Sequence, residues 1–321
     1  MLLLLIFVYF LGPKPAKPTF TQPFFSPASD LISLEKNIIE TERQMYGLRE
    51  GNAATILWAD STKKAKTKVA FLYLHGFGAS HREGEPVSID IAKQFGGNIF
   101  LARLFEHGIE KGEDNLLTFN AEDYYQSAEK ALHVARQLGD SVVVLATSGG
   151  AAMSLFLASR HPEIKCLVTY SPAVSLNSGL TNVLAGHWGL QIARLVQGKN
   201  HNDWTFRNPK QRNFWTNHQR LESRGAICCF QKNTMQRSTF ERVKCPVFLG
   251  YYYENEIRQD STVSVDAMQE MFGQLGTPPQ YKRAVSFPKA AAHVITSDLT
   301  TDAWQSVEAE SVRFLKEVVG L

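Results

Sequence analysis

The sequence predicts an α/β protein with a doubly wound, mostly parallel sheet. Five short apolar runs that are rich in strand-forming residues recur along the chain, at 69–74, 97–103, 141–147, 166–170 and 246–252. Strands that are apolar on both faces are typical of parallel sheets that helices cover on each side. Helical stretches lie between these runs, and the alternation extends over about 250 residues, which favours βαβ units over an all-β or all-α arrangement.

The overall composition is that of an ordinary folded protein. The 321 residues are 44% hydrophobic and 20% charged, and 34 Lys and Arg against 31 Asp and Glu leave a formal net charge of +3. These values exclude a disordered chain, a collagen-like fibre and a polytopic membrane protein, and they lack the basic excess of a nucleic-acid binder. The four cysteines have no ligand-like spacing with histidine, so we expect neither a zinc site nor a disulfide framework. The sequence does not predict an oligomeric state.

The N-terminal segment differs from the rest of the chain. Residues 1–12 carry no charge and are almost wholly apolar. This run is shorter than the roughly 18–20 residues of a membrane-spanning helix, but it suits an export signal or a signal-anchor; the alternative is an extension that docks on the fold. Residues 13–28 hold five prolines, which is typical of a stiff spacer. We therefore expect residues 1–28 to be a signal or anchor with a spacer, residues 29–321 to be the folded domain, and the protein to be membrane-anchored or exported, with a cytoplasmic location as the alternative.

Helical spacing marks three elements in order. Leu31, Leu34 and Ile38 recur at intervals of three and four, which predicts a helix at the start of the domain. The clearest helix covers 121–138, where a capping residue precedes it and a glycine follows it. Apolar residues on one face of 301–319 predict a closing amphipathic helix.

The strand predicted at 141–147 ends in the pattern of a nucleophile elbow, a sharp turn between a strand and a helix. Ser148 follows the strand, and small and apolar residues begin a helix at Gly149. In such a turn the residues two before and two after the nucleophile must be small, and here they are Ala146 and Gly150. Ala146 departs from the usual glycine by one methyl group. The pattern predicts that Ser148 is a nucleophile; the alternative is an ordinary N-cap serine.

A second turn follows the strand predicted at 69–74 and reads His-Gly-Phe-Gly-Ala-Ser. A turn in this place supplies a backbone donor to the oxyanion of a tetrahedral intermediate. We expect the N–H groups of Phe77 and Gly149 to form that oxyanion hole, where one donor is worth about 3–4 kcal/mol of barrier. His75 lies at a strand end, and we expect it to have a structural role.

Four motifs together resemble the α/β-hydrolase superfamily, specifically serine esterases and lipases with a helical lid of the monoacylglycerol-lipase-like and carboxylesterase-like kind. They are LYLHGFGAS at 72–80, ARLFEHG at 102–108, ATSGG at 146–150 and FPKAAAHV at 287–294. ARLFEHG looks like the segment that reads R-x-x-G-H-G in such members. The resemblance runs from about Ala53 onward. It implies an α/β-hydrolase fold with a helical lid insertion, and hydrolysis of a carboxylic ester through an acyl-enzyme with no cofactor and no metal.

The base and the acid follow the nucleophile in the chain order of this fold. His293 lies on the loop between a strand predicted at 280–288 and the final helix, so we expect it to be the base. Asp260 fits the pattern D-x-x-V ahead of a short helix and precedes His293 by 33 residues, so we expect it to be the acid. Glu254 and Glu256 lie nearer the preceding strand and remain alternatives.

An insertion separates the strands predicted at 166–170 and 246–252. The 75 residues between them exceed what one helix needs, which predicts a lid at about 173–240. The lid holds three of the five tryptophans, which either contact an acyl chain or form the lid's own core. Residues 190–245 carry 11 Lys or Arg against 3 Asp or Glu, a net charge of +8. This excess suits an anionic membrane surface or an anionic ester; the alternative is a solvated face with no partner.

Three functional hypotheses follow. The first is a serine hydrolase that cleaves an acyl ester or a lipid-like ester. The second is another acyl-transfer enzyme on the same fold, an acyltransferase or a peptidase, which differs only in the acceptor. The third is a non-catalytic binding member, which the ordered presence of Ser148, Asp260 and His293 disfavours. We expect a small-molecule or lipid ester as the partner, and no nucleic acid.

Overall fold

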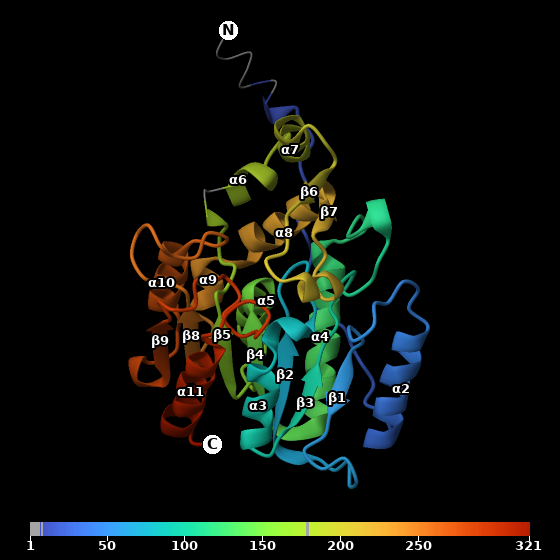
Figure 1. The fold of residues 1–321 in the computed structure, drawn as a ribbon, viewed down its shortest axis with the longest axis vertical. Coiled ribbons are helices and arrows are strands. Elements are labelled where there is room, and N and C mark those ends of the chain that lie inside the picture. The colour runs from blue at the N-terminus through green and yellow to red at the C-terminus, as the bar shows by residue number, and fades with distance from the viewer. Residues whose placement is uncertain (1–6, 8, 178–179) are drawn as a thin grey trace.

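In the computed structural model, which describes residues 7, 9–177 and 180–321, a seven-stranded sheet forms the centre of the molecule (Figure 1). Its strands in chain order are β1 (Thr55–Leu57), β2 (Thr67–Leu74), β3 (Asn98–Leu101), β4 (Gly139–Thr147), β5 (Cys166–Tyr170), β8 (Val247–Tyr251) and β9 (Lys282–Ser286). The order across the sheet is β1-β3-β2-β4-β5-β8-β9. β1 is antiparallel to β3, and the other neighbours are parallel. The predicted, mostly parallel sheet is confirmed.

Helices cover both faces of the sheet. One face packs against α3 (Val87–Gln94) and α11 (Trp304–Phe314), and the other against α2 (Leu31–Arg43), α4 (Ala121–Leu138) and α5 (Ser148–Ala158), with α10 (Val265–Gln274) beside β8. In β2, Leu72 and Leu74 belong to the core on the α4 side, and Phe71 and Tyr73 to the core on the α3 side. This alternation explains the continuous apolar run, because both faces of the strand are buried.

The predicted helices form, with small differences at their ends. The side chain of Asn120 caps α4 by accepting a hydrogen bond from the Asp123 N–H. α4 has the predicted bounds, and Gly139, which we expected to end it, is its C-cap as well as the first residue of β4. The closing helix is α-helical as far as Phe314 and continues as a π-helical turn at Leu315–Val319. The antiparallel strand β1 was not predicted, because three residues give too little periodicity.

The cap segment, which we define as residues 173–240, lies over the carboxyl ends of the strands (Figure 1). It contains α6 (Leu180–Leu184), α7 (Gly189–Gln197), β6 (His201–Asp203), β7 (His218–Arg220), α8 (Leu221–Thr234) and α9 (Arg237–Phe240). β6 and β7 pair as an antiparallel two-stranded sheet. Trp215 is buried in a small apolar cluster with Ala79 and Leu299, whereas Trp204 is 36% exposed. We gave the cap segment the bounds of the predicted lid; that it acts as a lid, and its boundaries as a unit, remain predictions.

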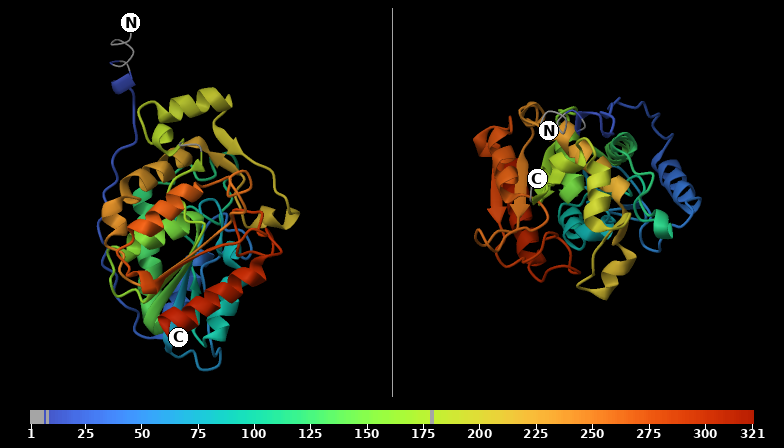
Figure 2. Two further views of the ribbon diagram at one scale, coloured as in Figure 1. Left: turned by 90° about the vertical axis from the view of Figure 1, so that its left-hand side faces the viewer. Right: turned by 90° about the horizontal axis from the view of Figure 1, so that it is seen from above.

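The proline-rich stretch 13–28, which we call the strap, lies against the body of the protein (Figure 2). The Thr19 N–H donates to Glu122 Oε1 at 3.2 Å, and the Ala28 N–H donates to Gln137 Oε1 at 2.8 Å. The ring of Phe20 makes edge contacts with aromatic rings of α4, α5 and α8. The strap is therefore packed, and the expectation that it only spaces an anchor from the folded domain is corrected, because the Phe20 ring packs among aromatic rings of α4, α5 and α8. A domain boundary near residue 29 remains a prediction.

Most of the apolar run 1–12 lies outside the described residues. Within them, no helix is long and apolar enough to cross a membrane. The end of the run contacts the cap segment, where His187 Nδ1 donates to the Gly12 carbonyl and the Trp188 N–H donates to the Pro13 carbonyl, both at 2.7 Å.

Candidate active site

Ser148 lies at the turn between β4 and α5, at the carboxyl edge of the sheet. Its φ of +53° lies in the left-handed region, which is strained for a residue with a side chain. The turn is tight enough that a Cβ on Gly150 would lie 2.2 Å from the Leu74 carbonyl oxygen. The small residue after the nucleophile is therefore a packing requirement, as the motif predicts.

The structure brings together the three residues that the sequence singled out. His293 Nε2 lies 2.8 Å from Ser148 Oγ, and His293 Nδ1 lies 2.6 Å from Asp260 Oδ2. Because the carboxylate of Asp260 can only accept, Nδ1 carries the proton and Nε2 accepts the hydrogen bond from the Ser148 hydroxyl. The arrangement can remove the hydroxyl proton as the oxygen attacks a carbonyl carbon.

Asp260 is buried, with 1% of its surface exposed. Its Oδ1 accepts hydrogen bonds from the N–H groups of Thr262 at 2.8 Å and Val263 at 3.1 Å. Burial raises the pKa of Asp260, but the charge and hydrogen bond of His293 and the two backbone donors outweigh it and keep the pKa below its ordinary value. Asp260 is therefore ionised at neutral pH.

The two alternative acids lie elsewhere. Glu254 pairs with Arg258 at 2.7 Å, and Glu256 accepts a hydrogen bond from the Tyr253 hydroxyl at 2.9 Å. Of the three acids that the sequence offered, Asp260 is the one whose side chain hydrogen-bonds the imidazole of His293.

His293 has an elevated pKa. Burial alone would lower the pKa, but the charge and hydrogen bond of Asp260, and to a smaller extent the charge of Glu83, raise it above its ordinary value. A more basic imidazole accepts a proton from a serine more readily, provided that it is neutral when substrate binds.

The two expected oxyanion donors lie side by side. The Phe77 nitrogen lies 3.1 Å from the position that a Cβ on Gly149 would take. Gly149 is in the first turn of α5, where backbone N–H groups have no partner within the helix. The Gly149 N–H therefore has no partner within the helix and lies close to the Phe77 nitrogen, beside Ser148. The assignment of these two groups as an oxyanion hole remains a prediction.

Glu83 is a buried carboxyl group at the site that sequence reasoning missed. Its Oε2 accepts a hydrogen bond of 2.5 Å from the N–H of Gly76, the residue before Phe77. Burial, which the Gly76 hydrogen bond and the charge of His293 only partly offset, raises the pKa of Glu83 to about 7. No periodicity marks this residue in the sequence, because its place depends on a tertiary contact.

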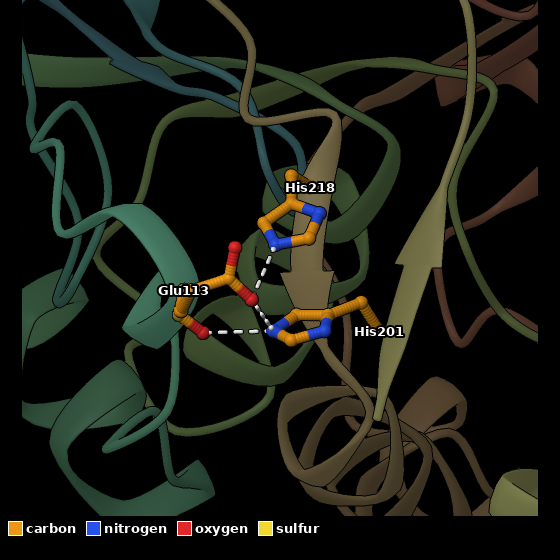
Figure 3. Close-up of side chains that lie close together, drawn as sticks. All are labelled: Glu113, His201 and His218. Atoms are coloured by element: carbon orange, nitrogen blue, oxygen red, sulfur yellow. Dashed lines mark hydrogen bonds and ion pairs between the residues drawn. The ribbon is translucent and has the colours of Figure 1, made fainter. Parts of the chain in front are cut away.

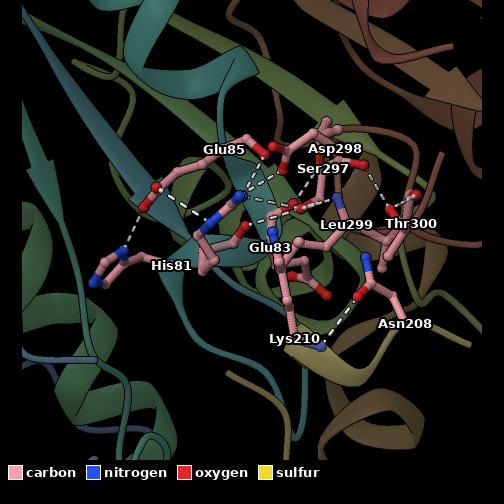
Figure 4. A network of polar contacts seen from close by, with 12 residues as sticks. His81, Glu83, Glu85, Asn208, Lys210, Ser297, Asp298, Leu299 and Thr300 are labelled. Carbon is pink, nitrogen blue, oxygen red and sulfur yellow. Dashed lines mark hydrogen bonds and ion pairs between the residues drawn. The ribbon is translucent and has the colours of Figure 1, made fainter. Parts of the chain in front are cut away.

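A polar network joins the segment around Glu83 to the loop that carries His293 (Figure 4). The Thr296 hydroxyl donates to the Glu83 carbonyl at 2.8 Å, and the Ser297 hydroxyl donates to the Arg82 carbonyl at 3.1 Å. Arg82 also pairs with Asp298 at 2.6 Å. The network therefore fixes the loop that carries His293 relative to the turn that carries Phe77.

A cavity of about 620 Å³ opens onto Ser148 and His293 beneath the cap segment. Its walls include the apolar side chains of Leu176, Trp204 and Ile227. This volume is within the ordinary range of small-molecule sites.

Comparisons with known proteins show what the chain is similar to in sequence and fold. No family model matches the chain. A thermostable monoacylglycerol lipase from Bacillus sp. (strain H-257) is 30% identical over 108 residues, which are 34% of this chain and 42% of that protein. The chain thus matches less than half the length of this relative.

Solved structures extend the likeness over most of the chain. A structure from a study of the metagenome-derived lipolytic enzymes LipS and LipT superposes with a TM-score of 0.65 at 15% identity, and the match covers 85% of this chain and 100% of that one. The chain has the α/β-hydrolase fold. A soluble variant of monoglyceride lipase from Saccharomyces cerevisiae, in complex with a substrate analogue, superposes with a TM-score of 0.60 at 15% identity, over 83% of this chain and 91% of that one.

In this α/β-hydrolase fold, the motif ARLFEHG has a packing role. Arg103 Nε donates to Glu42 Oε2 at 2.6 Å, which ties β3 to α2. His107 Nδ1 lies 2.7 Å from the Phe105 carbonyl, and His75 Nε2 accepts a hydrogen bond from the Leu104 N–H at 3.1 Å. Burial lowers the pKa of both histidines, which keeps them neutral. His75 therefore has contacts that suit the structural role expected of it.

Proposed function

We propose that this chain is a serine hydrolase that cleaves carboxylic esters through an acyl-enzyme. The hydrogen-bonded series Ser148–His293–Asp260, with distances of 2.8 and 2.6 Å, lies beside the backbone of Phe77 and Gly149 and supports the proposal. We assign Ser148 as nucleophile, His293 as general base and acid, Asp260 as the orienting acid, and the N–H groups of Phe77 and Gly149 as the oxyanion hole.

The reaction proceeds in two halves. Ser148 Oγ attacks the ester carbonyl carbon while His293 Nε2 takes the hydroxyl proton, and the carbonyl oxygen becomes an oxyanion held by the two N–H groups. When the carbon–alkoxide bond breaks, His293 returns the proton to the leaving alcohol. Water then attacks the acyl-serine with the same proton transfers, which releases the acid and restores Ser148.

The substrate that this cavity suits is an acyl ester or lipid-like ester. Apolar side chains of the cap segment line it, and they can bury an acyl chain at about 25 cal/mol per Å² of apolar surface. The names of the relatives, which include a monoacylglycerol lipase and a monoglyceride lipase, support the same class.

We also infer contact with an anionic membrane surface. Phe10 and Leu11 are 64% and 67% exposed, and the Phe10 ring contacts His187, two residues before α7. Leu195 and Val196, near the end of α7, are 83% and 77% exposed. Exposed apolar side chains next to a basic segment suit an anionic lipid surface. Co-sedimentation with anionic and with neutral vesicles tests this inference. Binding to anionic vesicles that Leu195→Ser does not weaken would contradict it. An exported or anchored location remains a prediction about residues 1–12.

A fluorophosphonate probe and a series of p-nitrophenyl esters test the enzymatic proposal. We expect covalent labelling at Ser148 and release of p-nitrophenol, with both lost in Ser148→Ala. Competition between water and added alcohols or amines as acyl acceptors separates a hydrolase from an acyltransferase, and a peptide substrate tests for a peptidase. Absence of labelling in a folded protein would favour a binding role.

A further inference from the structure

Three side chains with metal-ligating atoms meet on the outer face of the β6–β7 hairpin (Figure 3). His201 and His218 come from the two strands of the hairpin, and Glu113 comes from the short helical turn at Gly112–Asp114 of the main domain. Within the described residues, this is the one group of three His, Cys, Asp or Glu side chains whose ligand atoms all lie within 4.8 Å of one another. We propose that Glu113, His201 and His218 bind a divalent transition metal of the zinc type.

The spacing of the three atoms fits a tetrahedral ion. Glu113 Oε2 lies 3.5 Å from His201 Nε2 and 3.4 Å from His218 Nε2. Zinc bonds of about 2.0–2.1 Å in tetrahedral geometry separate neighbouring ligand atoms by about 3.3 Å. Two of the three separations are thus already near the required value. The ligand atoms of the two histidines lie within 4.8 Å of each other, and their rings stack at 4.0 Å. Metal binding would therefore require His201 to turn, to release the hydrogen bond from its Nε2 to the Glu113 carbonyl and to carry its proton on Nδ1 instead.

The residues around the two histidines favour a bound metal over a simple ion pair between Glu113 and the histidines. Asp203 Oδ1 lies 2.6 Å from His218 Nδ1, so it fixes the tautomer that leaves Nε2 unprotonated. A carboxylate on the far nitrogen of a ligating histidine is the usual second partner in zinc sites, and it raises the basicity of the ligand. His218 Nε2 is buried and lacks a hydrogen-bond partner among the described residues. Two imidazoles and one carboxylate favour zinc, cobalt or nickel over magnesium or calcium.

The site would clamp the cap segment to the main domain. Side chains alternate along a strand, so His201 and Asp203 lie on one face of the hairpin while Asn202 and Trp204 lie on the other. Asn202, Trp204 and Gln219 line the cavity over Ser148. A metal bound on the outer face of the hairpin would therefore restrict the movement of the residues on its other face, which line the cavity.

Titration of the chelator-stripped full chain with Zn²⁺ by calorimetry, and with Co²⁺ by visible absorption, tests this proposal. We expect one metal per chain and the absorption bands of tetrahedral cobalt. Affinity should fall at least tenfold in Glu113→Gln and in the double variant His201→Gln, His218→Gln, and about 10–100-fold in Asp203→Asn. His187→Gln, at a cap histidine outside the group, is the matched control and should bind normally.

Glu113 is an exposed side chain, so its variant folds even where the double variant does not. Absence of saturable binding at micromolar zinc would overturn the proposal. Equal binding by the full chain and by Glu113→Gln and Asp203→Asn would overturn it as well, because the metal would then bind elsewhere.

A second observation, independent of the first, concerns Arg224 on α8. Arg224 lines the cavity, and its guanidinium carbon lies 6.0 Å from the centre of the Phe77 ring. Burial lowers the pKa of Arg224, and the charge of Cys228 only partly offsets this effect. Of the other two arginines that line the cavity, Arg258 pairs with Glu254 at 2.7 Å, and Arg207 donates to the Ala291 carbonyl at 3.2 Å.

Arg224 is half-buried at the cavity wall and pairs with no carboxylate among the described residues. Removing a cation from water without an anionic partner is unfavourable, and a ligand with a negative charge offsets that cost. We infer, on the basis of the proposed ester hydrolysis, that Arg224 selects esters that carry an anionic group, a carboxylate or a phosphate, within reach of the oxyanion hole. A planar guanidinium donates two parallel hydrogen bonds to either group.

Paired substrates of equal length test this inference: p-nitrophenyl butyrate, and the p-nitrophenyl half-ester of succinate. We expect Arg224→Gln to lower kcat/KM for the half-ester at least tenfold, mainly through KM, and to change the neutral ester less than threefold. Arg258→Gln is the matched control and should leave the ratio of the two unchanged. Phosphate and acetate as competitive inhibitors distinguish the two kinds of anion.

The outcomes separate the two proposals. If the chain cleaves the neutral ester, but Arg224→Gln does not change the ratio of kcat/KM for the two esters, the inference about Arg224 is overturned and the proposed ester hydrolysis stands. Equal losses on both substrates would mean that Arg224 only supports the fold. Cleavage of neither ester by the unaltered chain would overturn the proposed hydrolysis and the selectivity that rests on it.

Discussion

Replacing Asp260 with asparagine tests the assignment of the acid. Oδ1 of Asp260 accepts from two backbone N–H groups at 2.8 and 3.1 Å, while Oδ2 faces His293 Nδ1 at 2.6 Å. In Asp260→Asn, the one remaining carbonyl oxygen is needed by the two backbone donors. The amide nitrogen, which can only donate, must then face His293. It forces the imidazole into the tautomer with its proton on Nε2, which cannot accept the proton of Ser148.

We therefore expect kcat to fall about 10⁴-fold, which corresponds to about 5.5 kcal/mol of barrier. Asp260 also raises the pKa of His293, and the imidazole must be neutral to act as a base. Activity should thus decline as the pH falls below that pKa, and the residual activity of Asp260→Asn should decline only at a lower pH. The measurement is p-nitrophenyl ester hydrolysis between pH 5 and pH 9, with thermal unfolding as a check on folding.

Glu254→Gln is the matched control, because it removes a carboxylate from the same loop that pairs with Arg258 and not with His293. We expect its kcat to stay within about threefold of the unaltered chain, since exposed ion pairs contribute little. A folded Asp260→Asn that keeps more than a tenth of the activity would refute the reasoning, and so would a larger loss in Glu254→Gln.

Three further predictions follow from other parts of the structure. Ser148→Ala should abolish ester hydrolysis while its unfolding midpoint stays equal or rises, because alanine removes the hydroxyl and nothing that packs; more than a few per cent of activity would contradict the assignment. Glu83 has a pKa of about 7 in the folded state and an ordinary value of 4.5. Between these two pH values Glu83 is ionised only in the unfolded state, so the free energy of unfolding falls as the pH rises. Glu83→Gln should reduce the difference in this free energy between pH 5 and pH 8, measured by urea unfolding, by up to about 3 kcal/mol. A form that begins at Pro27 loses the aromatic contacts of Phe20 and should unfold about 2 kcal/mol more easily, and equal stability of the two forms would mean that the strap contributes nothing.

Local patterns account for what the sequence could predict. The strands are visible because both faces are buried, and Ser148 because the tight turn restricts its neighbours. The acid stayed ambiguous, since the loop after β8 is longer than usual. In the structure Tyr253 pairs with Gln259 across this loop, and the chain returns so that the Asp260 N–H donates to the Tyr252 carbonyl at 3.2 Å.

Features that depend on contacts between distant segments could not be predicted. Glu83 acquires its role from Gly76 and from the loop of His293, and neither relation leaves a periodic signal. In the group of Glu113, His201 and His218, the glutamate lies 88 positions before the nearer histidine. No ligand spacing in the sequence marks this group. The proline content of the strap indicated extension correctly, but proline content does not reveal what an extended segment packs against.

The strap also bears on the order in which the molecule gains and loses structure. Its hydrogen bonds join residues that are 103, 109 and 140 positions apart, and it contributes no helix or strand of its own to nucleate. Its partners lie on α4, α5 and α8 and just after α5, so those helices must be in place before it can dock. We therefore predict that it assembles late and detaches early, by a local opening that leaves the sheet intact. Amide hydrogens such as that of Ala28 should exchange with solvent far sooner than those of β2 and β4.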